Sequence, residues 1–275
     1  MEVLDLFSGI GGFSLGLERA GMKTTAFCEI DPYCREVLKK HWPGILKFKD
    51  IEYLQPKKGD YDLICGGFPC QDISVAGKKE GIDGNRSGLW KEFYRIIKEV
   101  SPRWVIIENV ANLRNLGLAQ VIKDLWKIGY VGEWHIISAR SIGACHLRER
   151  VWIIAYPDRN PILQQQGWSS RSSREDTVQF GTIGEEGRAQ TSNANMPRLW
   201  RPFATEEEKQ KWWAKTTACF RDWWEAEPSI GRVDDGLSGG LDKNRRERIK
   251  ALGNSIVPQI AELIGKEIMK YEDTK

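Results

Sequence analysis

One cysteine in this 275-residue chain stands where a catalytic nucleophile would be placed. Residues 66–74 read GGFPCQDIS, and they follow the apolar run YDLIC at 61–65, which is typical of a buried strand. A cysteine that is fixed by a proline and opens a loop after a strand is suited to nucleophilic attack. Since free cysteine is also among the most buried residue types, Cys70 could equally be a structural core residue.

A carboxylate ends a second apolar run, because residues 104–108 read WVIIE. At a strand end next to the Cys70 loop, Glu108 would be partly desolvated, which favours its protonated form. It could then donate a hydrogen bond to a ring nitrogen of a bound base. The alternative is an exposed loop acid without a chemical role.

Two arginines lead directly into a third apolar run. Arg148 and Arg150 are two positions apart, so on an extended segment both side chains face the same side. Together they could hold a phosphate or a base carbonyl. Two ordinary surface arginines are the alternative.

A glycine-rich turn near the start of the chain predicts a nucleotide site. Residues 5–12 read DLFSGIGG and follow a strand, although their spacing is not that of a dinucleotide fingerprint. Glu29 ends the second strand, where its carboxylate can accept both hydroxyls of a ribose. Asp50 ends the next segment, in position to read an adenine amino group. These residues indicate an adenosine-containing ligand without a pyrophosphate, and a tight turn with no ligand is the alternative.

The elements that must position these residues alternate between strand and helix. We expect strands at 3–7, 23–29, 61–65, 104–108, 133–139 and 150–156, and helices at 13–20, 32–41, 89–100, 118–128 and 259–271. This alternation predicts an α/β fold with a doubly wound sheet, whose ligands bind at the carboxyl ends of the strands. Residues 157–240 are polar and loop-rich, so we expect one domain formed by 1–156 and 241–275 and a small second region at 157–240.

The composition excludes several classes of protein. Six cysteines without a Cys-x-x-Cys pair, together with only three histidines, argue against a zinc site, and no metal is expected. No apolar run approaches the ~20 residues that span a bilayer, and no signal peptide is evident. Free thiols favour a reducing compartment, so we expect a cytoplasmic protein. The net charge of +3 is too small to indicate a nucleic-acid partner by itself.

Taken in order, these motifs resemble those of the DNA (cytosine-5) methyltransferases over nearly the whole chain. The resemblance rests on residues 5–12, Glu29 and Asp50, residues 62–74, Glu108-Asn109-Val110, Arg148 with Arg150, and Gly253-Asn254-Ser255. His146 stands where the family usually has glutamine, and residues 227–233 replace the motif that normally precedes Gly-Asn. The resemblance implies a Rossmann-like, S-adenosylmethionine-dependent methyltransferase sheet with a target-recognition region inserted before the C-terminal helix.

The resemblance also implies a role for individual residues. Cys70 would add to C6 of a cytosine flipped out of duplex DNA, Glu108 would contact N3, and Arg148 and Arg150 would hold the O2 side. The residues expected at S-adenosylmethionine are Phe7, Ser8, Gly9, Gly11, Gly12, Glu29, Ile30, Asp50, Ile51, Gly67, Pro69, Leu89, Asn254 and Ser255. Gln71, Ser74, Lys78 and Lys79 would contact DNA from the loop after Cys70.

The expected partner is double-stranded DNA, and the expected form is a monomer. A cognate restriction endonuclease acting separately is possible, and so is a role in protecting bacteriophage DNA. One alternative is a cytosine-5 methyltransferase acting on tRNA, although the Cys-Phe-Thr feature of that branch does not follow residues 108–110. A catalytically silent DNA-binding relative is the other. Nothing in residues 157–240 indicates which DNA sequence is recognised.

Overall fold

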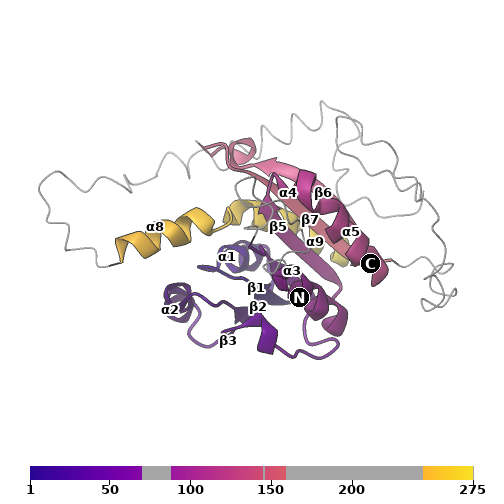
Figure 1. The fold of residues 1–275 in the computed structure, drawn as a ribbon, viewed down its shortest axis with the longest axis horizontal. Helices are drawn as coiled ribbons and strands as arrows, with labels where there is room; N and C mark the ends of the chain where they lie inside the picture. The colour runs from indigo at the N-terminus through magenta and orange to yellow at the C-terminus, as the bar shows by residue number, and fades with distance from the viewer. Residues whose placement is uncertain (70–87, 145, 159–243, 275) are drawn as a thin grey trace, which may run out of the picture.

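The computed structural model describes residues 1–69, 88–144, 146–158 and 244–274 (Figure 1). Within these residues, seven strands form one sheet in the order β3-β2-β1-β4-β5-β7-β6. Their bounds are β1 Glu2–Leu6, β2 Lys23–Cys28, β3 Leu46–Phe48, β4 Leu63–Gly66, β5 Trp104–Val110, β6 Tyr130–Ser138 and β7 Glu149–Pro157. Strands β1 to β5 pair in parallel, whereas β7 is antiparallel to both β5 and β6. The predicted α/β doubly wound fold is confirmed.

Helices cover both faces of this sheet. The described helices are α1 Gly12–Arg19, α2 Pro32–His41, α3 Gly88–Val100, α4 Leu113–Leu116, α5 Leu118–Lys127, α8 Arg245–Asn254 and α9 Pro258–Asp273, with 3-10 turns η1 Ile51–Tyr53 and η3 Ala139–Ile142. Alternate residues of β5 point to opposite faces, so Val105 and Ile107 pack with α3 and α5. Trp104 and Ile106 pack with α1 and α9 on the other face.

Local sequence explains how two of these helices begin and pack. Asp31 accepts hydrogen bonds from the backbone N–H groups of Tyr33 and Cys34, and Pro32 occupies the first position of α2. Helices α1 and α9 lie in close contact, which is possible because Gly16 has no side chain. A Cβ at this position would meet the backbone carbonyl of Pro258. This contact joins the C-terminal helix to the glycine-rich start of the chain.

The structure adds one strand that the sequence did not predict. Strand β3 is only three residues long, which is too short to produce a recognisable alternation of apolar and polar residues. The proposed division at residue 157 stays a prediction, because residues 159–243 lie outside the described part of the chain. None of the described helices is both long and apolar enough to cross a membrane.

Candidate active site

The carboxyl ends of four neighbouring strands bring the predicted site residues to one edge of the sheet. Leu6 at the end of β1 pairs with Cys28 of β2 and with Gly66 of β4. Gly66 in turn pairs with Ile107 of β5. The next residue along each strand is therefore Phe7, Glu29, Gly67 or Glu108. Since parallel strands place their ligand sites at this edge, these four positions define the candidate site.

Hydrogen bonds hold the Glu29 side chain in place at this edge of the sheet. Its side chain is buried, with Oε2 accepting from the Gly9 N–H at 2.7 Å and Oε1 accepting from the Asp31 N–H at 2.7 Å. The Arg35 guanidinium also donates to the Glu29 backbone carbonyl at 3.0 Å. A carboxylate has about four acceptor positions, so each oxygen can still accept one further hydroxyl hydrogen. Glu29 thus keeps the capacity to bind a ribose diol.

The glycine-rich turn has a backbone that few side chains tolerate. Phe7, Gly9 and Gly11 all have positive φ angles, of 53°, 54° and 87°. The Ser8 hydroxyl donates to the backbone carbonyl of Asp5 at 2.5 Å, and this hydrogen bond stabilises the turn. A Cβ at Gly11 would lie 2.6 Å from the Trp42 ring, whereas one at Gly9 would meet nothing within 4 Å. The open side at Gly9 leaves room for a ligand beside Glu29.

The other residues expected at the cofactor differ in how much of their side chain is exposed. Asp50 accepts from the Glu52 N–H at 3.1 Å and so caps η1, which leaves its second oxygen for a ligand. The Ile51 side chain is in the core, so only its backbone could contact a cofactor. Ile30 is 64% exposed, and Leu89 is half-buried against the core cluster that contains α3. The Phe7 ring is half-buried, 6.0 Å from the Phe93 ring.

The junction between α8 and α9 also reaches the glycine-rich turn. A Cβ at Gly12 would lie 2.8 Å from the Ser255 hydroxyl and 2.9 Å from the Ile256 side chain. Asn254 is exposed at the last position of α8. The fold therefore brings Ser255 and Ile256 against Gly12, although more than 240 positions separate them in the sequence.

Glu108 lies in a buried charge pair at the end of β5. It is 8% exposed, and its Oε1 is 3.1 Å from Nε of Arg150. Burial raises the pKa of Glu108 to about 7, while Arg150 and Arg148 oppose this shift. Both protonation states are therefore populated near neutral pH, and the protonated form can donate a hydrogen bond. Its burial excludes the alternative of an exposed loop acid.

The backbone that leads into Cys70 is fixed to the Glu108 strand. A Cβ at Gly67 would lie 2.9 Å from Glu108 Oε2, so only glycine leaves room for the carboxylate there. Asn109 is buried, and its amide donates to the Phe68 carbonyl at 3.0 Å while its oxygen accepts from the Val110 N–H at 2.9 Å. Sequence reasoning gave Asn109 no role, although its place beside Glu108 was the available signal.

Pro69 is exposed and is the last described residue before position 70. Cys70, Gln71, Ser74, Lys78 and Lys79 lie outside the described residues, so their expected roles stay predictions. The described contacts end one residue short of the expected nucleophile. They fix the start of its loop through Phe68 and Gly67.

We expect Asn109→Ala to lower the kcat of the methyl transfer that the family resemblance implies by about 10- to 100-fold, because a misplaced reacting group can cost that much. The variant lacks the side-chain amide that donates to the carbonyl of Phe68, two residues before Cys70. Affinity for S-adenosylmethionine, measured by calorimetry, should change little. The control is Asn115→Ala, which removes an exposed amide on α4. An Asn109→Ala enzyme with unchanged kcat would remove this positioning role.

Arg148 and Arg150 do not share an extended segment, so that prediction was wrong. Arg148 has a positive φ of 31°, and β7 begins only at Glu149. The backbone turns there because the Ala139 N–H is bound by the carbonyls of Leu147 and Arg148. Arg148 Nη2 donates to the carbonyls of Gly253 at 3.0 Å and Ser255 at 2.6 Å. Arg150 contacts Glu108, whereas Arg148 ties the α8–α9 junction to the same pocket.

Three other cysteines in the described part of the chain are poor nucleophiles. Burial raises the pKa of Cys28 and of Cys34 to about 12, and that of Cys65 well above its usual value. A thiol with such a pKa forms almost no thiolate at neutral pH. Among the described residues, no group of three or more His, Cys, Asp or Glu side chains is arranged to hold a metal ion.

Asp5 is a buried acid that sequence reasoning left without a role of its own. It lies beneath the glycine-rich turn, and the Ser14 hydroxyl donates to its Oδ2 at 2.7 Å. Burial raises the pKa of Asp5 to about 8, so its protonated form predominates at neutral pH. A neutral Asp5 adds little negative charge beneath the Glu29 site.

Comparisons with known proteins identify the family of this chain. A family model described as C-5 cytosine-specific DNA methylase matches residues 1–228. The Type II methyltransferase M2.BsuMI of Bacillus subtilis (strain 168) is 40% identical over 179 residues, which cover 62% of this chain and 46% of that protein. The Type II methyltransferase M.NlaIV of Neisseria lactamica is 32% identical over 225 residues, or 75% of this chain and 52% of that protein. The chain spans about half the length of these curated relatives.

A solved structure supports the fold. The Entamoeba histolytica methyltransferase EhMeth superposes with a TM-score of 0.50 at 22% identity, covering 58% of this chain and 54% of that one. Since the family model covers 228 of the 275 residues and the strand-end motifs lie together at one edge of the sheet, the chain belongs to the C-5 cytosine-specific DNA methylase family.

Proposed function

We propose that this protein is a DNA (cytosine-5) methyltransferase that transfers a methyl group from S-adenosylmethionine to C5 of a cytosine in duplex DNA. The observation that carries the proposal is the buried Glu108–Arg150 pair beside the loop that begins at Gly67. A carboxyl group with a pKa of about 7 next to a guanidinium is suited to hold a polar ring edge. Membership of the methylase family supports cytosine as that ring.

The residues at the glycine-rich turn fit S-adenosylmethionine. Glu29 retains acceptor positions for two ribose hydroxyls, and Gly9 leaves open space next to it. Asp50, Phe7 and the backbone of Ile51 would bind the adenine, while Gly67, Pro69, Leu89, Asn254 and Ser255 complete the set. When bound, this cofactor supplies the methyl group.

The residues of the chain prepare the base. A cytosine must leave the duplex stack before C5 and C6 can be reached. Cys70, as a thiolate, adds to C6, while Glu108 donates a hydrogen bond or proton to N3 and Arg150 contacts the O2 side. This addition makes C5 nucleophilic towards a methyl donor. Loss of the C5 proton and elimination of Cys70 restore the aromatic ring.

Arg148 acts on the base pocket indirectly in this scheme. It acts on the base pocket through its charge, which lowers the pKa of Glu108, and through its hold on Gly253 and Ser255. The loop after Cys70, with Gln71, Ser74, Lys78 and Lys79, contacts DNA and excludes water from the closed site.

The biological setting is also part of the proposal. Relatives named Type II methyltransferases support a role in restriction–modification, with protection of bacteriophage DNA as a second setting. We propose a cytoplasmic monomer whose residues 157–240 recognise the target sequence. A cognate endonuclease would act as a separate protein.

Labelled S-adenosylmethionine tests this activity directly. Incubation with duplex DNA should place the label on cytosine C5, and bisulfite sequencing of DNA from expressing cells should show the methylated sequence. A matched tRNA substrate should remain unlabelled. Label on tRNA alone would favour the RNA-modifying alternative, and binding of DNA without label would favour a silent relative.

We expect Glu29→Ala to weaken the affinity for S-adenosylmethionine by roughly 100-fold or more, since hydrogen bonds to a charged group each contribute about 1.5–3 kcal/mol and Glu29 would accept two. The affinity for duplex DNA should be nearly unchanged. Calorimetry measures the first quantity and fluorescence anisotropy the second. Glu36→Ala, which removes an exposed acid from α2, is the matched control. Undiminished cofactor binding by Glu29→Ala would contradict the assignment.

A further inference from the structure

Helix α8 is polar and almost unburied, which is unusual for a helix that adjoins a binding site. Four of its first six residues are Arg or Lys, namely Arg245, Arg246, Arg248 and Lys250. Ala251 is the one buried residue of this helix, and residues 244–250 are all exposed. A helix that buries so little gains little stability from packing. Contacts near its C-terminal end therefore matter for its position.

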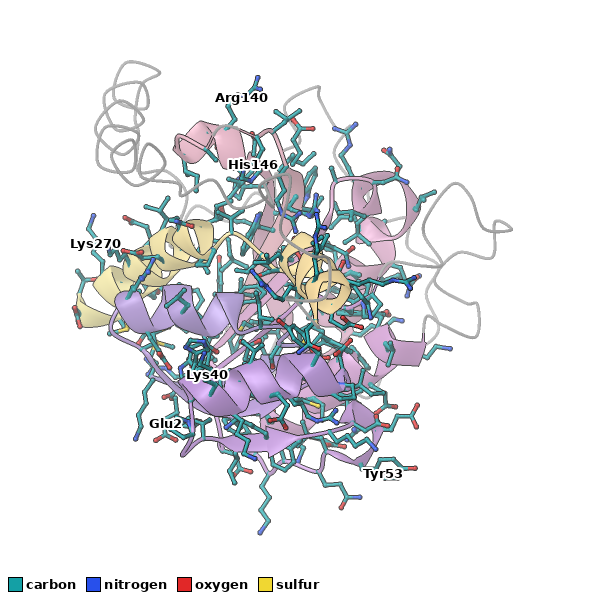
Figure 2. All side chains as sticks on the ribbon, turned by 90° about the vertical axis from the view of Figure 1, so that its left-hand side faces the viewer. Glu2, Lys40, Tyr53, Arg140, His146 and Lys270 are labelled. Atoms are coloured by element: carbon teal, nitrogen blue, oxygen red, sulfur yellow. The ribbon has the colours of Figure 1, made fainter. Side chains whose placement is uncertain are left out.

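Two contacts hold the C-terminal half of α8. Arg148 Nη2 donates to the carbonyls of Gly253 and Ser255, next to the Glu108 pocket. Lys250 Nζ lies 3.1 Å from Asp31 Oδ2, and Asp31 is also the N-cap of α2. The end of α8 is thus attached between the base pocket and the Glu29 loop. Its first turns extend away from the sheet (Figure 1), on the side of the molecule that faces the viewer in Figure 2.

The outward side of α8 follows from these contacts. At 100° per residue, Lys250 and Ala251 mark the side that faces the body of the protein. Arg245 lies on the opposite side, with Ile249 and Leu252, and Arg246 lies on the flank of the helix next to Lys250. Ile249 is 60% exposed and Leu252 is 54% exposed, so this side is open to a partner. Neither Arg245 nor Arg246 has its charge balanced by a carboxylate among the described residues.

Helix α8 is long enough to reach several phosphates of a duplex held at the pocket. Arg245 lies nine residues before Asn254, which is about 14 Å along a helix axis. Duplex DNA carries one negative charge per about 1.7 Å of its axis, so a duplex at the pocket presents several phosphates over that length. Helix α8 ends at the pocket, and its exposed arginines lie near its other end, at about that distance.

We propose that α8 is a phosphate-binding element that holds duplex DNA beside the base pocket through Arg245 and Arg246. The inference rests on the proposed action on duplex DNA and adds a contact surface within the catalytic part of the chain. Phosphate contacts set the position of a duplex without reading its sequence. Arg245 and Arg246 therefore contribute equally to the binding of target and non-target DNA.

The test is the salt dependence of DNA binding by the double variant Arg245→Gln/Arg246→Gln. Each lost phosphate contact reduces the slope of log K against log salt by about one, so the slope should become shallower by about two. At ~0.1 M salt the Kd for a duplex should rise by roughly tenfold or more, for target and non-target sequences alike. The affinity for S-adenosylmethionine should stay unchanged, which shows that the Gly253–Ser255 end remains in place.

The control variant, Lys57→Gln/Lys58→Gln, removes the same number of exposed charges from the segment before β4, at the opposite edge of the sheet. It should retain nearly the wild-type slope. Equal slopes for the α8 variant and wild type would overturn the inference, and so would a loss confined to the target sequence. If wild type itself neither binds nor methylates duplex DNA, the proposed function fails instead.

Discussion

Replacing Cys70 with serine is expected to reduce methyl transfer to duplex DNA by a factor of about 10⁴ or more, since removing a nucleophile has effects of that order. A serine hydroxyl forms far less anion at neutral pH than a thiol and does not add readily to C6. The affinity for duplex DNA should remain close to that of wild type, because Cys70 forms its bond only after the base is bound. Transfer of labelled methyl groups and fluorescence anisotropy measure the two quantities.

The control for this substitution is Cys219→Ser, which removes a thiol from the polar region at 157–240. It should leave the rate of transfer unchanged. Full activity of the Cys70→Ser protein would contradict the assignment of the nucleophile. The high pKa values of Cys28, Cys34 and Cys65 mean that none of these three offers a ready substitute.

Replacing Glu108 with glutamine should lower kcat/KM by about 10²- to 10⁴-fold, the usual contribution of a general acid or base. The pH dependence should change as well. The wild-type carboxyl has a pKa of about 7 because of its burial, and in the proposed mechanism its protonated form would donate to N3. The wild-type kcat/KM should therefore fall as the pH rises through about 7, whereas the Glu108→Gln profile lacks this fall.

Stability gives an independent check on the state of Glu108. Its folded pKa is raised from 4.5 to about 7, so its stabilising effect is complete below pH 4.5 and is lost as the pH rises through 7. At ~1.4 kcal/mol per unit, this change amounts to about 3 kcal/mol of unfolding free energy. Urea unfolding at pH 5 and pH 8 should show a smaller difference for Glu108→Gln than for wild type. If the difference in unfolding free energy between pH 5 and pH 8 were equal in the two proteins, Glu108 would be ionised over this whole pH range.

The sequence was sufficient to predict the strands that carry the site and the edge at which they meet. Short apolar runs ending in Glu29 or Glu108 identify parallel strands, and a parallel sheet brings their ends together. The N-cap at Asp31 was predictable for a similar reason, because the capping contact is local in the chain. Strand β3 is too short for its pattern to be recognised.

The contacts within the site could not be predicted, because they depend on tertiary packing. Asn109 reaches Phe68, 41 positions earlier, and Arg148 reaches Ser255, 107 positions later. The positive φ of Arg148 interrupts the extended segment that a two-residue spacing implied, although the charges of both arginines still act on Glu108. Local pattern gives residue types and strand ends, whereas these side-chain partners are decided by the assembled sheet and the α8–α9 junction.

Covalent trapping tests the central claim most directly. Duplex DNA containing the target sequence with 5-fluorocytosine is incubated with the protein and S-adenosylmethionine, and the complex is analysed by peptide mass spectrometry. The last step needs loss of a proton from C5, and fluorine cannot leave as a cation, so the bond to C6 should persist. We predict a stable protein–DNA complex whose bond maps to Cys70. Methylation of ordinary duplex DNA with no trapped complex, or a bond at any other residue, would contradict this account.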